Sequence, residues 1–193
     1  MKTKIVICAG GQSRRMGRDK AGLDLCGESL LERAVRRYRT EFGENHVFIA
    51  SGDRSYGFAP AEIRDIAPGC GPISALHAAL TGLEEQYAGV FLTAVDMPLA
   101  EPAFAARLIQ FAEEAGRKIT LCKNGESYET LFSWYGAELL PEIERCMQQG
   151  QYSLFRLAKK TGFAEFAAEQ TETLLNTNTP EEFGELKRSY SKK

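Results

Sequence analysis

The stretch KIVICAGGQSRRMGRDK, residues 4–20, decides how the N-terminal part of this chain folds. Its first six residues, 4–9, are mostly apolar and rich in β-branched side chains, which predicts a buried β-strand. Gly10 and Gly11 follow at once, and a backbone without Cβ atoms lets another segment or a ligand approach closely. Three arginines and a lysine then fall within residues 14–20. A strand that runs into a glycine-rich basic loop opens an α/β fold with an anion site at the end of its first strand.

The chemistry of this loop favours a phosphate ligand, because backbone N–H groups and Arg or Lys side chains together cradle phosphates. The alternative is a turn that ends the strand and carries solvated charges. Two familiar phosphate loops do not match. Five residues separate Gly11 from Gly17 and Arg18 comes next, whereas a P-loop needs four residues and then Lys. The dinucleotide fingerprint Gly-x-Gly-x-x-Gly is absent as well.

The composition of the 193 residues, 44% of them hydrophobic, fits one domain with a substantial core. We expect it to span residues 1–188, followed by a frayed tail at 189–193. The net charge of -2 argues against a nucleic-acid partner. Residues 1–40 nevertheless hold ten Lys or Arg against four Asp or Glu, and the remainder holds fourteen against twenty-two. A basic N-terminal part on an acidic body suggests a local anionic ligand.

The cysteines indicate a reducing environment. They are odd in number and form no CxxC pair, which argues against a disulfide framework or a zinc site: Cys8, Cys26, Cys70, Cys122 and Cys146. Cys8, Cys26 and Cys122 lie in or beside apolar runs, so we expect buried thiols there. With neither a signal peptide nor a long apolar span in the sequence, we expect a cytoplasmic protein with no membrane partner.

Strand and helix signals alternate along the first half of the chain. Strands are predicted at 4–9, 46–51 and 89–95, and helices at 29–42, 71–86 and 102–115. This rhythm predicts an α/β, single-domain, Rossmann-like three-layer αβα sandwich with a mostly parallel sheet. Ligands bind at the carboxyl ends of the strands in such sheets. The loop at 9–20, Asp65 and Asp96 all fall at or beyond strand ends, so we expect them to share one site.

The second half of the chain is less regular. Residues 118–135 predict two antiparallel strands joined at Asn124-Gly125. Residues 136–150 predict a helix in which Pro141 marks a kink or a start. A strand is expected within 171–178, and Thr179 with Glu182 forms a capping box for a last helix.

The loop around residues 8–20 resembles the signature Leu-Ala-Gly-Gly-x-Ser-x-Arg-Met-Gly-x-Asp-Lys of the molybdenum cofactor guanylyltransferases. The match runs through Ala9, Gly10, Gly11, Ser13, Arg15, Met16, Gly17, Asp19 and Lys20, with Cys8 in place of the usual Leu. Further segments match in order, through Asp65, Gly69, Gly71 and Pro72, then Asp96, Met97 and Pro98, then Asn176, Asn178, Thr179 and Pro180. The ordered set spans nearly the whole chain.

The resemblance implies Mg²⁺-dependent transfer of GMP from GTP to the molybdopterin cofactor, with release of pyrophosphate. It implies catalytic roles for Arg15, Lys20 and Asp96, with Asp96 holding the metal. The implied nucleotide contacts are Cys8, Ala9, Gly10, Gly11, Lys20, Asp65 and Asp96. We expect Asn176 and Asn178 on the acceptor side, and proteins that deliver the cofactor or mature molybdoenzymes as further partners.

Some departures from the family pattern leave alternatives open. The segment IASGDR, residues 49–54, lacks the family's Ser-Ala-Asn-Arg, whose Asn contacts guanine, and Ala75 stands where Gly is common. The alternatives are a transferase that uses CTP or another phosphorylated acceptor, and a GTP-binding regulator that transfers nothing. Asp96 has a simpler interpretation as a helix N-cap. His46 and His77 are expected to be structural. Trp134 is expected in the core, with the alternative that its strand lines the acceptor side.

Overall fold

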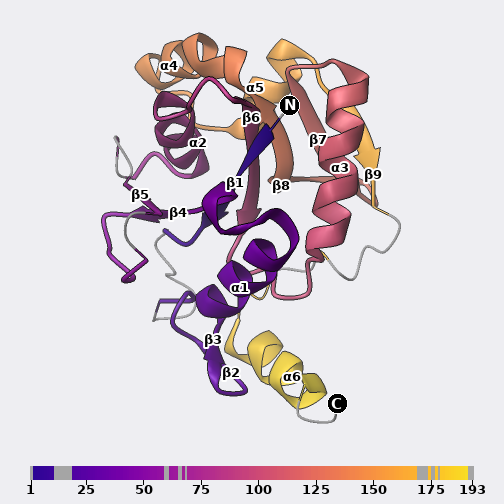
Figure 1. The fold of residues 1–193 in the computed structure, drawn as a ribbon. Helices are drawn as coiled ribbons and strands as arrows, with labels where there is room; N and C mark the ends of the chain where they lie inside the picture. The colour runs from indigo at the N-terminus through magenta and orange to yellow at the C-terminus, as the bar shows by residue number, and fades with distance from the viewer. Residues whose placement is uncertain are drawn as a thin grey trace.

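The computed structural model describes residues 2–10, 19–58, 61–64, 67, 69–168, 174, 177 and 179–190. These residues form a seven-stranded sheet of order β5-β4-β1-β6-β8-β7-β9, with helices on both faces (Figure 1). Its strands are β1 (Lys2–Cys8), β4 (Val47–Gly52), β5 (Glu62–Arg64), β6 (Tyr87–Ala94), β7 (Ile119–Asn124), β8 (Ser127–Gly136) and β9 (Ala164–Ala167). A two-stranded ribbon, β2 (Asp24–Leu25) with β3 (Glu28–Ser29), lies apart from the sheet.

The strand directions confirm the expected mixed sheet. Strands β5, β4, β1 and β6 run parallel, and β8 runs antiparallel to both β6 and β7. The β7–β8 hairpin turns at Asn124-Gly125, as predicted, and Gly125 has the positive φ of 61° that this turn requires. The parallel β9 closes the sheet beside β7.

Side chains of β1 alternate between two cores, which makes the domain a three-layer sandwich. The helices are α1 (Leu30–Phe42), α2 (Pro72–Thr81), α3 (Pro102–Ala115), α4 (Leu140–Gln148), α5 (Leu154–Thr161) and α6 (Pro180–Tyr190), with 3₁₀ turns η1 (Glu44–His46) and η2 (Ala137–Leu139). The core that contains Ile5 and Ile7 also contains side chains of α1, α3 and α6, whereas the core of Val6 and Cys8 contains side chains of α2, α4 and α5. The expected α/β sandwich is confirmed.

The helix boundaries follow the local signals. Ser29 and Glu32 form the predicted capping box of α1. Gly116, in the left-handed conformation, ends α3. Pro141 stands in the first turn of α4, so it starts that helix and does not kink one. Thr179 and Glu182 exchange the expected cap bonds, and α6 continues to Tyr190, two residues into the segment expected to fray.

Several expectations were incomplete or wrong. Strands β5 and β9, the β2–β3 ribbon and helix α5 were not predicted, and α2 stops at Thr81, short of residue 86. Cys26 was expected to be buried but is exposed, because it sits at the tip of the β2–β3 turn with a φ of 58°. Most of the strand expected at 171–178 lies outside the described residues. Within the described part of the chain, none of the helices has the length and apolar character that crossing a membrane requires.

The buried Tyr38 predicts that the fold loses stability in alkali. Its hydroxyl donates to Thr93 Oγ1 at 3.1 Å, and burial raises the pKa of Tyr38 to about 12. A raised folded-state pKa contributes stability that is present below the unfolded value near 10 and is lost as the pH rises toward 12. The free energy of unfolding in urea should fall by about 1 kcal/mol less in Tyr38→Phe than in the wild type between pH 9 and pH 11. Equal losses in the two proteins would contradict this assignment.

Candidate active site

The carboxyl ends of three parallel strands meet at one edge of the sheet. Cys8, the last residue of β1, is paired with Ala50 on one side and Ala94 on the other. The segments that follow β1, β4 and β6 therefore emerge side by side, which places Ala9 and Asp96 at the same edge, as expected.

Gly10 brings the loop after β1 against the end of β4. The N–H groups of Ala9 and Gly10 both donate to the Ala50 carbonyl at 3.0 Å. A Cβ atom on Gly10 would lie 2.9 Å from the Gly52 nitrogen and 3.1 Å from the Gly52 Cα. Only glycine fits this approach without moving backbone.

Gly10→Ala is therefore expected to push the loop away from β4. Because the obstructing atoms are main chain, we expect a loss of about tenfold or more in kcat/KM through misplacement of the loop. The matched control is Gly22→Ala, since within the described part of the chain no atom beyond its chain neighbours lies within 4 Å of a Cβ at Gly22. Steady-state kinetics of Gly10→Ala and Gly22→Ala test this prediction. Equal kcat/KM values in the two variants would show that the close approach of Gly10 to Gly52 has no role.

Lys20 and Asp96 form the central pair of the site. Lys20 Nζ lies 2.7 Å from Asp96 Oδ2, and the two side chains are 15% and 21% exposed. Two residues expected from the sequence to act together are thus in direct contact, although 76 positions separate them. The pair puts a positive and a negative charge at the edge where the glycine-rich loop begins.

The position of Asp96 excludes the simpler interpretation that it caps the N-terminus of a helix. It lies in a turn after β6, closed by the Met97 N–H donating to the Ala94 carbonyl at 3.2 Å. The N-cap of α3 is Glu101, so Asp96 caps no helix there. Its own carbonyl accepts the Thr177 N–H at 2.8 Å, which ties the C-terminal segment to this turn.

The donor set fits a magnesium ion held jointly with a substrate. Asp96 Oδ2 accepts from Lys20, and within the described residues no hydrogen bond to Oδ1 is present. Among those residues there is also no group of three His, Cys, Asp or Glu that could hold a metal alone. Mg²⁺ beside nucleotides commonly takes one or two carboxylates, with phosphates and water completing its shell. One open carboxylate oxygen next to a basic loop meets that need.

The remaining predicted site residues divide into two groups. Cys8 ends β1 with its side chain in the core and its carbonyl bonded to the Val95 N–H at 3.1 Å. The other predicted residues lie outside the described part of the chain: Gly11, Arg15, Asp65, Asn176 and Asn178.

Sequence reasoning missed two residues of the β4–β5 connection. Arg54 and Tyr56 both contact Asp19, which the sequence singled out only as a position that matches the family signature. Neither residue shows a periodic signal, and it is the fold that brings both of them to residue 19. The Arg that ends the segment IASGDR was the one available hint.

The histidines and the tryptophan contact neighbouring side chains away from the Lys20–Asp96 pair. His46 Nδ1 lies 3.0 Å from the Tyr87 hydroxyl, and His77 Nε2 lies 3.6 Å from Glu144. Trp134 is buried and donates from Nε1 to Thr3 Oγ1 at 3.2 Å.

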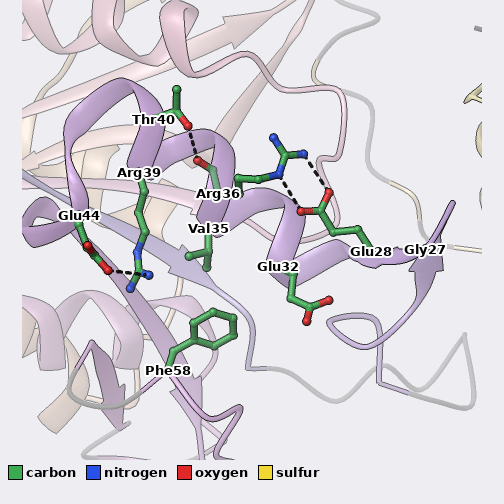
Figure 2. A pocket seen from close by; sticks show the side chains of 9 residues that line it. All are labelled: Gly27, Glu28, Glu32, Val35, Arg36, Arg39, Thr40, Glu44 and Phe58. Atoms are coloured by element: carbon green, nitrogen blue, oxygen red, sulfur yellow. Dashed lines mark hydrogen bonds and ion pairs between the residues drawn. The ribbon is translucent and has the colours of Figure 1, made fainter.

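A separate groove runs along α1, with Phe58 on its opposite side (Figure 2). Its charges are paired internally: Arg36 makes two bonds to Glu28, at 2.8 and 2.9 Å, and Arg39 lies 3.3 Å from Glu44. With Glu32, three glutamates face two arginines. Among the residues that the structure describes, this groove offers an anionic triphosphate no net positive charge, which argues against a nucleotide site there.

The overall structure matches a solved structure along nearly its whole length. A molybdopterin-guanine dinucleotide biosynthesis protein A from Archaeoglobus fulgidus superposes with a TM-score of 0.84 at 25% identity, covering 99% of this chain and 100% of that one. Together with the site at the sheet edge, the comparisons define the protein as a nucleotidyltransferase.

The chain belongs to the family of the MobA-like NTP transferase domain, whose model matches residues 5–165. It is 30% identical to a probable molybdenum cofactor guanylyltransferase from Opitutus terrae, covering 96% of this chain and 95% of that protein. It is 31% identical to a molybdenum cofactor guanylyltransferase from Rhizobium meliloti, covering 92% and 87%. The resemblance stated from the sequence is confirmed at the level of the family.

Proposed function

We propose that the protein transfers GMP from GTP to molybdopterin cofactor, forming the guanine dinucleotide form of the molybdenum cofactor and pyrophosphate. The observation that carries this proposal is the Lys20–Asp96 contact at the carboxyl edge, beside the glycine-rich loop. The names of the relatives support the substrates. In the reaction, an acceptor phosphate oxygen bonds to the α-phosphorus of GTP as the bond to the pyrophosphate oxygen breaks.

Nucleotidyl transfer brings two anions together, so the residues must align them and offset their charge. Lys20, with a mobile ammonium, is placed to follow negative charge onto the transferring phosphate. Arg15, in the same basic loop, would hold the triphosphate as a second cation. The short Lys20–Asp96 distance keeps the ammonium at the sheet edge, where both phosphates must meet.

Asp96 would hold Mg²⁺ through its open carboxylate oxygen. The ion, when bound, draws charge from the α-phosphate and from the departing pyrophosphate. Asp96 also orients Lys20, since their contact is a charge-assisted hydrogen bond.

Recognition of guanine would fall to Ala9, Gly10, Gly11 and Asp65. The N–H groups of Ala9 and Gly10 are used by β4, so their carbonyl oxygens are what they can offer a base. Carbonyls and a carboxylate accept hydrogen bonds, and the Watson–Crick edge of guanine presents two donor groups, N1–H and the N2 amino group. This match favours GTP over CTP.

The acceptor side is proposed to include Asn176 and Asn178. Thr177, between them in the sequence, is buried and bonded to the Asp96 carbonyl. A pterin held by this segment would have its phosphate near the metal-binding aspartate. We further propose a cytoplasmic location and partners that deliver the cofactor or receive the product.

The test is pyrophosphate release with Mg²⁺, molybdopterin cofactor and each of GTP, ATP, CTP and UTP. We expect release with GTP and background rates with the others. Release with CTP alone would move the protein to the cytidylyl alternative and would assign that change to the segment at residues 49–54. GTP binding without release would contradict transfer and favour the regulator.

A further inference from the structure

Asp19, in the described part of the basic loop, uses both of its carboxylate oxygens in hydrogen bonds or ion pairs. Its Oδ2 lies 2.7 Å from Arg54 Nη1 and 3.0 Å from the Tyr56 hydroxyl, and its Oδ1 accepts the Ala21 N–H at 3.1 Å. Both oxygens are therefore used, and both contacts to Oδ2 come from the connection between β4 and β5.

The Tyr56 hydroxyl reaches both ends of the glycine-rich loop. Besides Asp19 at 3.0 Å, it lies 3.3 Å from the carbonyl oxygen of Ala9. A phenol has one proton to donate, and the nearer, charged carboxylate is the stronger acceptor. Burial, followed by the hydrogen bond to Asp19, raises the pKa of Tyr56 to about 12, so the hydroxyl keeps its proton at neutral pH.

The connection that carries Arg54 and Tyr56 is itself fixed. Glu62 Oε1, at the start of β5, accepts the backbone N–H groups of Tyr56 and Phe58, each at 2.8 Å. The Arg54 N–H donates to the Ser51 carbonyl at 3.2 Å, which forms a turn directly after β4. A segment anchored to two strands can therefore hold the loop against the sheet.

The neighbours Asp19 and Lys20 face opposite partners. Asp19 is bound to Arg54 and Tyr56, whereas Lys20 reaches Asp96 at 2.7 Å. The contacts of Asp19 with the β4–β5 connection fix the backbone orientation at this point. With that orientation, the side chain of Lys20 points toward Asp96. Arg54 also offsets the negative charge of Asp19. The cations of the loop therefore remain available to bind phosphate.

We propose that Arg54 and Tyr56 are positioning residues that clamp both ends of the glycine-rich loop and thereby aim Lys20 at the transferring phosphate. This inference rests on the proposed function for the identity of the nucleotide, GTP, but not for the clamp itself. Its test therefore needs one measurement with nucleotide and one without.

The measurement without nucleotide is limited trypsin cleavage of residues 14–20, followed by mass spectrometry. Tyr56→Phe and Arg54→Gln should be cut there about fivefold or more faster than the wild type, because each loses one bond that restrains the loop. Tyr190→Phe is the matched control, since its hydroxyl accepts one bond from Arg33, at 3.0 Å, on α1. Arg54→Lys keeps the charge and should restore slow cleavage.

The measurement with nucleotide is the Kd for Mg·GTP. Tyr56→Phe should weaken binding about tenfold, because a loop that is not preorganised must be ordered at the cost of affinity. In a Lys20→Met background the same change should cost less than about twofold, since its effect acts through Lys20. A role in general stability would instead give equal losses in both backgrounds.

The outcomes separate the two claims. Unchanged cleavage in Tyr56→Phe and Arg54→Gln overturns the clamp. Faster cleavage with an unchanged Kd overturns the positioning of Lys20. A wild type that does not bind GTP removes the proposed function, and the cleavage comparison still decides whether Arg54 and Tyr56 restrain the loop.

Discussion

Replacing Asp96 by Asn is expected to lower kcat about a thousandfold, while the protein stays folded. Asn preserves the shape and one acceptor oxygen of the side chain but removes its charge. The proposed cation would lose its one identified protein ligand, and Lys20 would lose the carboxylate that holds it at 2.7 Å. Because both losses act on the transferring phosphate, the effect should appear in kcat more than in the Kd for GTP.

The matched control for Asp96→Asn is Asp24→Asn. Asp24 also pairs with a lysine, Lys187 at 2.9 Å, but the pair is exposed and lies on the β2–β3 ribbon beside α6. Asp24→Asn should leave kcat within about twofold of the wild type, as is usual for exposed ion pairs. Single-turnover kinetics and thermal unfolding of both variants distinguish lost chemistry from lost stability. Normal turnover in Asp96→Asn would show that the reaction does not use this carboxylate, and would contradict its proposed role in holding the metal.

Lys20→Met is expected to lower kcat/KM about a hundredfold or more, with about tenfold of the loss in the binding of GTP and the rest in kcat. Methionine preserves much of the aliphatic length of lysine, so packing changes little while the ammonium is removed. The partly buried Asp96 is then left without its cation, which adds negative charge where a phosphate must approach. Stopped-flow or quench kinetics at saturating GTP measure the change.

The control for this substitution is Lys187→Met, which breaks the exposed pair with Asp24. It should leave both constants within about twofold of the wild type. Lys20→Arg keeps the charge but changes the reach and geometry of the donor, so we expect it to recover only part of the activity. Full activity in Lys20→Met would mean that the loop's arginines alone neutralise the phosphate.

The layers and the sheet edge were predictable from the sequence because each rests on a local signal. Apolar β-branched runs located β1, β4 and β6, and their parallel order places Lys20 and Asp96 at one edge. The caps at Ser29 and Gly116 fixed helix ends to within a residue. Long elements with strong periodicity or clear caps are those that pattern reasoning finds.

Short elements carry too little pattern to be found in this way. Strands β5 and β9 are three and four residues long, and they are strands because β4 and β7 offer them free edges. Cys26 was misplaced because the apolar run around it folds back as a two-stranded ribbon, which turns its tip to solvent.

The contacts of Asp19 show a second limit. Arg54 and Tyr56 lie 35 and 37 positions away in the sequence, and no spacing rule links them to the loop. The close approach of Gly10 to Gly52, together with the hydrogen bonds from Ala9 and Gly10 to Ala50, brings the two connections together. The sequence motif identified the loop. The contacts of Arg54 and Tyr56 with that loop depend on how two strand ends pack, which the motif does not encode.

The most direct test of the account is the fate of the label when the wild type turns over [α-³²P]GTP with Mg²⁺ and molybdopterin cofactor. We expect the label in a pterin-linked dinucleotide, with one unlabelled pyrophosphate released for each molecule formed. Label recovered as GDP with free phosphate would show hydrolysis in place of transfer. Label remaining in GTP that the protein still binds would show a nucleotide-binding protein without the proposed reaction.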